Sequence, residues 1–260
     1  DKIYDAFRKD PKYLGGGTGS GFKNRAVAAL DSVDPLAEKI GAVNVIVKTD
    51  DKLRGYNTDG IGFVRGLEEL LKEHRGIESL KGLKVLILGA GGTADAIAFT
   101  LSFKGAELTI LNRTAEKAEK LAERIVQSGG IAFGGGEDLL AVKLPEAQVV
   151  INASTKGADG PFSDYIAFAP ATKNELDNNI NESKENVKYL DSKAIVCDIN
   201  LRLDESPILK MAREAGHLTQ DGSAMNFHQA VEAMWLIHEN EFTKKNLSKE
   251  DIAPLIKEVS

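Results

Sequence analysis

The sequence predicts an α/β protein with a doubly wound parallel sheet and a smaller N-terminal α/β lobe. Two observations support this fold class. From about residue 80, short apolar runs such as residues 85–88 alternate with amphipathic segments of helical length. Before that point the one clear strand pattern, around Val43, Val45 and Val47, is alternating rather than continuous. Strands that alternate with helices join through right-handed crossovers into a parallel sheet.

The predicted N-terminal lobe covers residues 1–79. Residues 1–14 are expected to form a short polar helix. Residues 15–21 contain five glycines, too many for a helix interior or a good strand. Two interpretations of this run stay open. It is either a flexible linker or a loop that brings backbone amides close to a ligand.

The rest of this lobe has recognisable start and stop signals. Pro35 in a first turn predicts a helix to about residue 40. Alternating valines predict a strand over 42–48, and the Asp50–Asp51 turn leads to a second strand over 52–56. Polar capping residues at 57–60 then predict a helix through residue 71.

The second predicted domain covers residues 80–223. A glycine turn follows the run at 85–88 and opens a helix to about residue 103. Residues 160–192 are polar and asparagine-rich, and we expect a surface insertion with one short helix there. Residues 224–260 are expected to return to the first lobe. The remaining predicted elements are strands at 107–111, 148–151 and 194–197 and helices at 115–127, 206–215 and 224–238.

Composition excludes several classes of function. The chain has 260 residues and a net charge of −6, with both signs interspersed. This balance gives no electrostatic footprint for nucleic acid or an anionic membrane. Apolar runs are far too short to span a bilayer, and the first residues show no signal-peptide pattern. We therefore expect a cytoplasmic protein that acts on a small molecule.

Cysteine and histidine usage gives two further expectations. The single cysteine, Cys197, excludes an internal disulfide and fits a reducing compartment. The four histidines are scattered without ligand spacing, so we expect no metal site. Oligomeric state cannot be predicted from these features.

The glycine turn after residues 85–88 predicts a dinucleotide site. Residues 89–94 read Gly-Ala-Gly-Gly-Thr-Ala and lie between a buried strand and a helix, the context that the Rossmann fingerprint requires. Gly89 permits the tight turn, and Gly91 lets the backbone approach a pyrophosphate. Ala94 takes the small position where helix packs on strand. The helix N-terminus offers free N–H groups to phosphate.

The end of the next strand favours NADP over NAD. NAD sites place an Asp or Glu there to accept the ribose hydroxyls. This chain instead has Asn112, Arg113 and Thr114. Arg113 can bind a 2′-phosphate bidentately, Thr114 can donate a hydroxyl, and Lys117 adds charge one turn later. The alternative is that Arg113 is simply a solvated surface residue.

The N-terminal lobe carries a candidate proton-transfer pair. Lys23 and Asp59 stand among polar residues that include Asn44. A lysine paired with an aspartate can move a proton to or from a hydroxyl while hydride moves at the adjacent carbon. Taken singly, these positions are more often explained by an exposed lysine and a helix-capping aspartate.

Several ordered motifs in one register resemble the shikimate dehydrogenase family. Residues 40–44 (Ile-Gly-Ala-Val-Asn) and 55–63 (Gly-Tyr-Asn-Thr-Asp-Gly-Ile-Gly-Phe) match its substrate lobe, and Lys23 stands where its lysine is expected. Residues 89–92 and 112–118 match its NADP site. Residues 151–155, Asp198, 206–209, 221–222, Met225 and 228–230 follow its later pattern. The similarity spans about residues 22–237.

The resemblance implies reversible reduction of 3-dehydroshikimate to shikimate by NADPH. Lys23 and Asp59 would form the proton-handling pair, and Asn44 and Gln229 would bind substrate hydroxyls in a cleft between two lobes. The cofactor residues predicted from the turn and the resemblance together are Gly89, Ala90, Gly91, Gly92, Thr93, Asn112, Arg113, Thr114, Lys117, Ala153, Ser154, Gly222 and Met225.

The sequence departs from the family on the substrate side. The family's Asn-Val-Thr-x-Pro-x-Lys run corresponds to residues 17–23, so we expect polar substrate contacts to be lost or displaced onto Thr18 and Ser20. A substrate-contacting tyrosine is replaced by Leu201. The Ser-x-Ser segment and the first strands have no counterpart, which predicts a shortened substrate lobe. Two alternatives therefore stay open: a reductase of a different carbonyl compound, and a non-catalytic protein that binds NADP or a metabolite.

Overall fold

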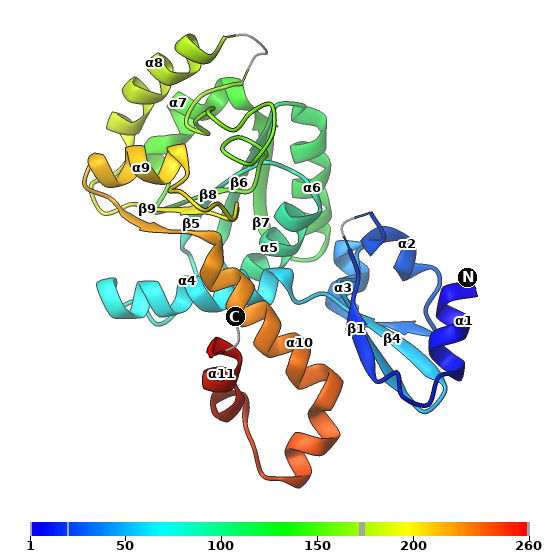
Figure 1. Cartoon of the computed structure of the whole chain (residues 1–260). Helices are drawn as coiled ribbons and strands as arrows, with labels where there is room; N and C mark the ends of the chain where they lie inside the picture. Colours follow the sequence, from blue (N-terminus) through cyan, green and yellow to red (C-terminus); the bar gives the residue numbers. More distant parts are fainter. Residues whose placement is uncertain (1, 20, 172–174, 259–260) are drawn as a thin grey trace. The chain divides into compact units, whose positions relative to one another are not determined.

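The computed structural model describes residues 2–19, 21–171 and 175–258 (Figure 1). The chain forms two compact units. The first comprises residues 1–66 and 225–260, and the second comprises residues 67–224. Two helices, α4 (Asp59–Arg75) and α10 (Gly222–Lys244), contribute residues to both units.

The second unit is built on a six-stranded sheet in which all neighbouring strands are parallel. Its elements are β5 (Lys84–Leu88), α5 (Gly92–Phe103), β6 (Glu107–Asn112), α6 (Ala115–Gln127), β7 (Ile131–Gly136), α7 (Leu140–Lys143), β8 (Val149–Asn152), α8 (Leu176–Asn186), β9 (Ile195–Asp198), α9 (Pro207–Glu214) and β10 (Leu218–Gln220), with short 3₁₀ turns at Glu137–Leu139, Leu144–Glu146 and Val187–Tyr189.

Strand order confirms the predicted doubly wound fold. Across the sheet the strands run β10-β9-β8-β5-β6-β7. Read from β7, this is the 3-2-1-4-5-6 order of the Rossmann fold, with β5 first in sequence. The order in which strands are added reverses between β5 and β8, which pair in parallel from Val85 with Val149 to Leu88 with Asn152. Ligands of such sheets bind outside the carboxyl ends of the strands at this switch point.

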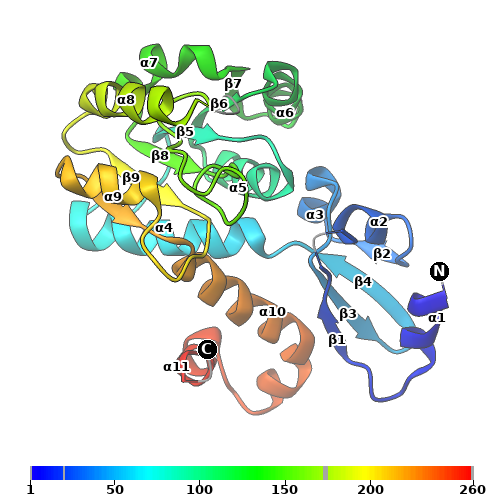
Figure 2. The same ribbon diagram turned by 45° about the horizontal axis from the view of Figure 1, so that its top comes forward.

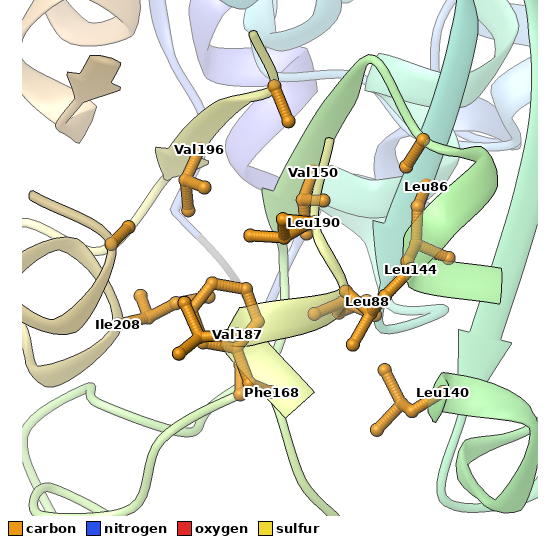
Figure 3. Packing of buried hydrophobic residues seen from close by; sticks show 14 of the residues in the cluster. Leu86, Leu88, Leu140, Leu144, Val150, Phe168, Val187, Leu190, Val196 and Ile208 are labelled. Atoms are coloured by element: carbon orange, nitrogen blue, oxygen red, sulfur yellow. The ribbon is translucent and has the colours of Figure 1, made fainter. Parts of the chain in front are cut away.

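Helices and a loop segment cover the sheet and complete its core. Figure 1 shows α7, α8 and α9 on one side of the strands and α5 on the other. On the first side, alternate strand residues such as Leu86, Leu88 and Val150 point toward Leu144 and Ile208 (Figure 3). Each is almost fully buried. Burial of one such side chain contributes roughly 1.5–3 kcal/mol, so this layer is a main source of stability for the unit.

The predicted surface insertion at 160–192 is wrong in part. One helix, α8, does form there. However, Ile166 and Phe168 are buried in the same core cluster. Two of the asparagines that suggested a solvated loop, Asn179 and Asn186, bind backbone instead. Asn179 accepts from Ile166 N at 2.8 Å and donates to Ile166 O at 3.0 Å, and Asn186 donates to Phe168 O at 2.8 Å. Buried amides with satisfied hydrogen bonds hold this irregular segment against the core.

The first unit contains a four-stranded sheet in the order β1-β3-β4-β2. Tyr4, Ala37 and Ile46 belong to the apolar cluster beside it. Asp34 caps α3 by accepting from Leu36 N at 3.0 Å, as its position before Pro35 predicts. The elements are α1 (Lys2–Lys9), β1 (Gly15–Gly17), α2 (Lys23–Val27), β2 (Ser32–Val33), α3 (Pro35–Ile40), β3 (Val45–Thr49), β4 (Lys52–Tyr56) and α11 (Lys249–Lys257), together with parts of α4 and α10.

The first half of the glycine run is neither a flexible linker nor a ligand-binding loop, the two alternatives that the sequence left open. Residues Gly15–Gly17 form β1 and pair antiparallel with β3. The absence of side chains is what allows this. A Cβ at Gly15 would lie 2.5 Å from Ile46 O and 2.9 Å from Cγ1 of Ile237 in α10. Gly15 therefore fits between β3 and α10 only because it has no side chain.

The C-terminal helices belong to the first unit. Figure 2 shows α10 as a long helix that bends before α11. The bend coincides with His238, whose backbone is not helical (φ −116°, ψ 15°). Ser248 and Asp251 form a capping box at the start of α11. Lys249 donates to both carboxylate oxygens of Glu232 at 2.7 Å, which links α11 to α10.

Candidate active site

Lys23 and Asp59 are brought together in the first unit. Lys23 begins α2 and Asp59 begins α4. Lys23 Nζ donates to Asp59 Oδ2 at 2.6 Å. The aspartate side chain is only 5% exposed, whereas the lysine is 24% exposed. A buried carboxylate requires a compensating charge, and Lys23 supplies it while keeping a path to solvent.

Asn44 fixes the orientation of the carboxylate. Its Nδ2 donates to Asp59 Oδ1 at 2.8 Å and to Thr58 Oγ1 at 3.1 Å. Its Oδ1 accepts from Thr58 N at 2.8 Å. Asn57 adds a local turn by accepting from Asp59 N at 3.1 Å. Both oxygens of Asp59 therefore have a defined donor, and the amide of Asn44 is directed into the site itself.

Gly62 positions α10 against the first turn of α4. A Cβ at Gly62 would lie 2.6 Å from Met225 O and 2.7 Å from Gln229 N. The two helices thus approach backbone to backbone three residues after Asp59. Gln229 is placed beside α4 in this way, and its Nε2 donates to Asn226 Oδ1 at 2.6 Å.

The glycine-rich segment presents few side chains to the first unit's site. Thr18 continues the β1 pairing, with its N donating to Asn44 O at 2.8 Å. Its hydroxyl donates to Val43 O. A Cβ at Gly19 would meet no atom within 4 Å. Ser20, the other predicted substitute contact, lies outside the described residues.

The glycine turn of the second unit forms one wall of a hollow at the switch point. Gly89 has φ +117°, and a Cβ there would lie 2.5 Å from Ala153 O. This residue must therefore be glycine on two counts. Gly91 and Gly92 differ, because a Cβ at either would meet nothing within 4 Å. They begin α5 with open space in front of free N–H groups, a cradle that fits a pyrophosphate.

Two cationic residues, Arg113 after β6 and Lys117 in α6, line the same hollow. Arg113 and Lys117 are both in its lining, and the Arg113 guanidinium lies 5.6 Å from the ring centre of Phe162. Asn112 Nδ2 donates to Thr114 O at 2.9 Å and shapes the turn before α6. The acidic residue after the glycine turn, Asp95, is paired with Arg124 at 2.7 Å.

The structure places the predicted cofactor residues as follows. Those that line the hollow are Gly89, Ala90, Gly91, Asn112, Arg113, Lys117, Ala153 and Ser154. Gly92 and Thr93 form the first turn of α5, and Thr114 precedes α6. Gly222 and Met225 lie at the start of α10, where a Cβ at Gly222 would be 2.5 Å from Ile199 O.

A cluster of polar side chains holds the loop after β8 in place. Asn152 Nδ2 donates to Asp198 Oδ1 at 3.1 Å, and Ser154 Oγ donates to Asn152 Oδ1 at 2.7 Å. Asn200 Nδ2 donates to Ser154 O at 3.2 Å. Burial raises the pKa of Asp198. The cluster ties the cofactor-side loop to the end of β9.

Sequence reasoning missed two charged residues in the hollow, Glu137 and Lys156. Glu137 follows β7, a strand that the sequence did not predict, and Lys156 lies in the loop after β8. Lys156 Nζ lies 2.9 Å from Glu137 Oε1. A lysine directly after the Asn-Ala-Ser-Thr segment was the available signal. Nothing local linked it to residue 137.

Two features are absent from the described parts of the chain. Within residues 2–19, 21–171 and 175–258, no group of three or more His, Cys, Asp or Glu side chains is arranged to hold a metal ion. In the same residues, no helix combines the length and apolarity that a membrane span would need.

The fold and the two sites define a class of protein. A Rossmann sheet with a glycine cradle and a cationic lining is typical of dinucleotide-binding proteins, and a partly buried Lys–Asp pair is suited to proton transfer. Comparison with known proteins agrees. Residues 69–158 match the family model described as shikimate/quinate 5-dehydrogenase.

Individual relatives extend this match over most of the chain. A protein of Methanosarcina acetivorans named shikimate dehydrogenase (NADP(+)) is 37% identical over 254 residues, which cover 91% of this chain and 82% of that protein. The chain therefore belongs to the shikimate dehydrogenase family, which confirms the resemblance inferred from its motifs.

Solved structures show the same fold. Shikimate 5-dehydrogenase of Listeria monocytogenes, in complex with shikimate and NAD, has a TM-score of 0.79 at 27% identity and covers 99% of this chain and 81% of its own. A 5-ketofructose reductase of a Gluconobacter strain has a TM-score of 0.72 at 26% identity, with coverages of 100% and 83%.

Proposed function

We propose that this chain is an NADP-dependent oxidoreductase that interconverts 3-dehydroshikimate and shikimate. The observation that carries the proposal is the Lys23–Asp59 pair, 2.6 Å long and held by Asn44. The Methanosarcina relative is named for this reaction and this cofactor. A single reduced cysteine, Cys197, is consistent with the cytoplasmic location that such a role would have.

The proton step follows from the geometry of the pair. In the direction of reduction, the Lys23 ammonium donates a proton to the substrate oxygen as the carbonyl carbon gains hydride. Asp59 stabilises the ammonium beforehand and orients Nζ, because its other oxygen is held by Asn44. Lys23 then regains a proton from solvent, to which it is 24% exposed. In the direction of oxidation the neutral amine accepts the hydroxyl proton.

NADP fits the hollow of the second unit. When bound, NADPH supplies the hydride. Gly91 and Gly92 leave room for its pyrophosphate, and the N-terminus of α5 faces that space. Arg113 and Lys117 would bind the 2′-phosphate. Asp95 does not oppose this binding, because Arg124 already pairs with its carboxylate.

A second candidate is a reductase of another polyhydroxylated ketone. Gly17 and Gly19 offer no side-chain donor where the family has Asn and Thr, and Thr18 donates to Val43 O. A site that loses donors to substrate hydroxyls loses discrimination among hydroxylated compounds. The similarity to a structure named 5-ketofructose reductase favours this alternative specifically.

A substrate panel separates the candidates. The purified chain is given NADP⁺ or NAD⁺ with shikimate, quinate or a polyol, and NADPH formation is followed by absorbance. Turnover of shikimate with NADP⁺ supports the proposal. Turnover only with a polyol, or reduction only of 5-ketofructose by NADPH, supports the second candidate. NADPH binding without any turnover would indicate a non-catalytic protein instead.

A further inference from the structure

The hollow of the second unit contains a buried ion pair that the proposed reaction does not use. Lys156 Nζ lies 2.9 Å from Glu137 Oε1, and the two side chains are 6% and 8% exposed. Lys156 Nζ also donates to Ala169 O at 2.8 Å. Both residues belong to the lining of the hollow, together with Arg113 and Lys117.

The pair connects separate parts of the cofactor site. Glu137 follows β7, at one edge of the sheet, whereas Lys156 lies in the loop after β8, at the switch point. Two strands, β6 and β5, stand between them. The ion pair therefore joins the segment after β7 to the loop after β8, and Arg113 lies in the same lining.

The negative charge of Glu137 would oppose binding of a cofactor with a 2′-phosphate. Among the described residues that line the hollow, it is the one carboxylate. Its Oε2 is buried without a hydrogen-bond partner in the described structure. NAD sites use an acidic side chain to accept ribose hydroxyls, and a carboxylate near a bound 2′-phosphate repels it.

Lys156 compensates the negative charge of Glu137. Lys156 Nζ and Glu137 Oε1 form an ion pair at 2.9 Å; burial lowers the pKa of Lys156, and the Glu137 carboxylate opposes that lowering. The ammonium then offsets the carboxylate. Two cationic residues, Arg113 and Lys117, remain in the lining to face a phosphate.

We propose that Lys156 is a specificity-determining residue, which neutralises Glu137 and so sets the preference of the hollow for NADP over NAD. This inference rests on the proposed function in one respect, that the hollow binds a nicotinamide dinucleotide. Lys156 acts through Glu137, so it is a positioning and charge-compensating residue rather than a catalytic one.

The test is a double-mutant cycle on cofactor binding. Dissociation constants of NADPH and NADH are measured by calorimetry, without substrate, for the wild type, Lys156→Met, Glu137→Gln and the double variant. Met keeps the length of the aliphatic stem and removes the charge. Thermal unfolding of each variant reports on the fold separately.

We expect Lys156→Met to weaken NADPH binding by at least roughly tenfold and NADH binding much less, because the Glu137 carboxylate in this variant would carry an uncompensated charge in the same lining as Arg113 and Lys117. The double variant should recover most of the wild-type preference, since both charges are then absent. Glu137→Gln alone should keep or strengthen NADPH binding. Recovery in the double variant also guards against a Lys156→Met protein that fails to fold.

Two results would overturn the inference. One is an equal loss of NADPH and NADH affinity in Lys156→Met, which would indicate a purely structural role. The other is a double variant that has lost the preference as completely as Lys156→Met. A wild-type chain that binds neither dinucleotide would instead contradict the proposed function, so the two failures are distinguishable.

Discussion

At the scale of single residues, buried asparagines hold the carboxylates of the sites in position. Asn44 has both amide protons directed at Thr58 and Asp59, and Asn152 holds Asp198 and accepts from Ser154. Each amide connects two segments far apart in sequence. Because a buried polar group must be paired, these asparagines fix the carboxylates more firmly than packing alone would.

Arg113 provides the first residue-scale prediction. Replacement by Ala should raise the dissociation constant of NADPH by about 10–100-fold, because a charge-assisted contact to phosphate is lost. NADH binding should change little. Calorimetry on both cofactors checks this, with Lys120→Ala as a control for a basic residue of α6 that pairs with Glu116 at 2.6 Å. Equal weakening of both cofactors would contradict the assignment of Arg113 to the 2′-phosphate.

Cys197 provides the second residue-scale prediction. It lies in β9 and is fully buried, and burial raises the pKa of its thiol, with the Asp198 carboxylate adding to the effect. A raised thiol pKa means that less of the reactive thiolate is present at any pH below it. The native protein should therefore not react with a chromogenic disulfide reagent at neutral pH. The same protein unfolded in guanidinium should react and release one equivalent of the reagent's coloured thiolate, because the chain has one cysteine. Rapid reaction of the native form would contradict the burial of Cys197 within β9.

At the scale of elements, the strength of the hydrophobic pattern decided what could be predicted. The β5–α5–β6–α6 stretch follows its predicted bounds closely, because buried parallel strands are continuously apolar and α6 has a clear apolar stripe. Strands β1 and β7 escaped prediction because both are glycine-rich. A Cβ at Gly134 would lie 2.3 Å from Ala118 O, so α6 packs directly on the β7 backbone. Such tight contact between elements leaves no signal in the local sequence.

The contrast between Gly15 and Gly16 tests this explanation for β1. Gly15→Ala places a Cβ 2.5 Å from Ile46 O and should destabilise the protein by about 1–3 kcal/mol through overpacking. Gly16→Ala is the matched control, because its nearest neighbour would be Tyr13 Oη at 3.6 Å. Urea unfolding of both variants gives the comparison. A Gly15→Ala protein as stable as the control would show that β1 does not pack as described.

Gly62 supplies the second element-scale prediction. Its replacement by Ala forces α4 and α10 apart where Met225 O would be only 2.6 Å away. Gln229 moves with α10, so we expect a raised KM for shikimate together with a lower Tm, and a smaller change in KM for NADP⁺. Steady-state kinetics and thermal unfolding check this. Unchanged values of both KM and Tm would contradict the close helix contact.

At the scale of the whole molecule, the fold class followed from the sequence, but the composition of the sites did so only in part. Lys23 and Asp59 are 36 residues apart, and only the family resemblance paired them before their 2.6 Å contact was seen. Glu137 and Lys156 had no such guide, because their contact depends on how β7 and the β8 loop lie in the folded sheet. Charge compensation between distant segments is a property of the fold that periodicity cannot predict.

The measurement that tests the central claim most directly is shikimate-dependent reduction of NADP⁺ by the wild type and by Lys23→Met. We predict turnover by the wild type and a loss of kcat of roughly 100- to 10,000-fold in the variant, the usual contribution of a general acid–base group. The NADPH dissociation constant should be unchanged, since Lys23 belongs to the first unit. Undiminished turnover by Lys23→Met would contradict the proton-transfer role that the Lys23–Asp59 pair is proposed to have.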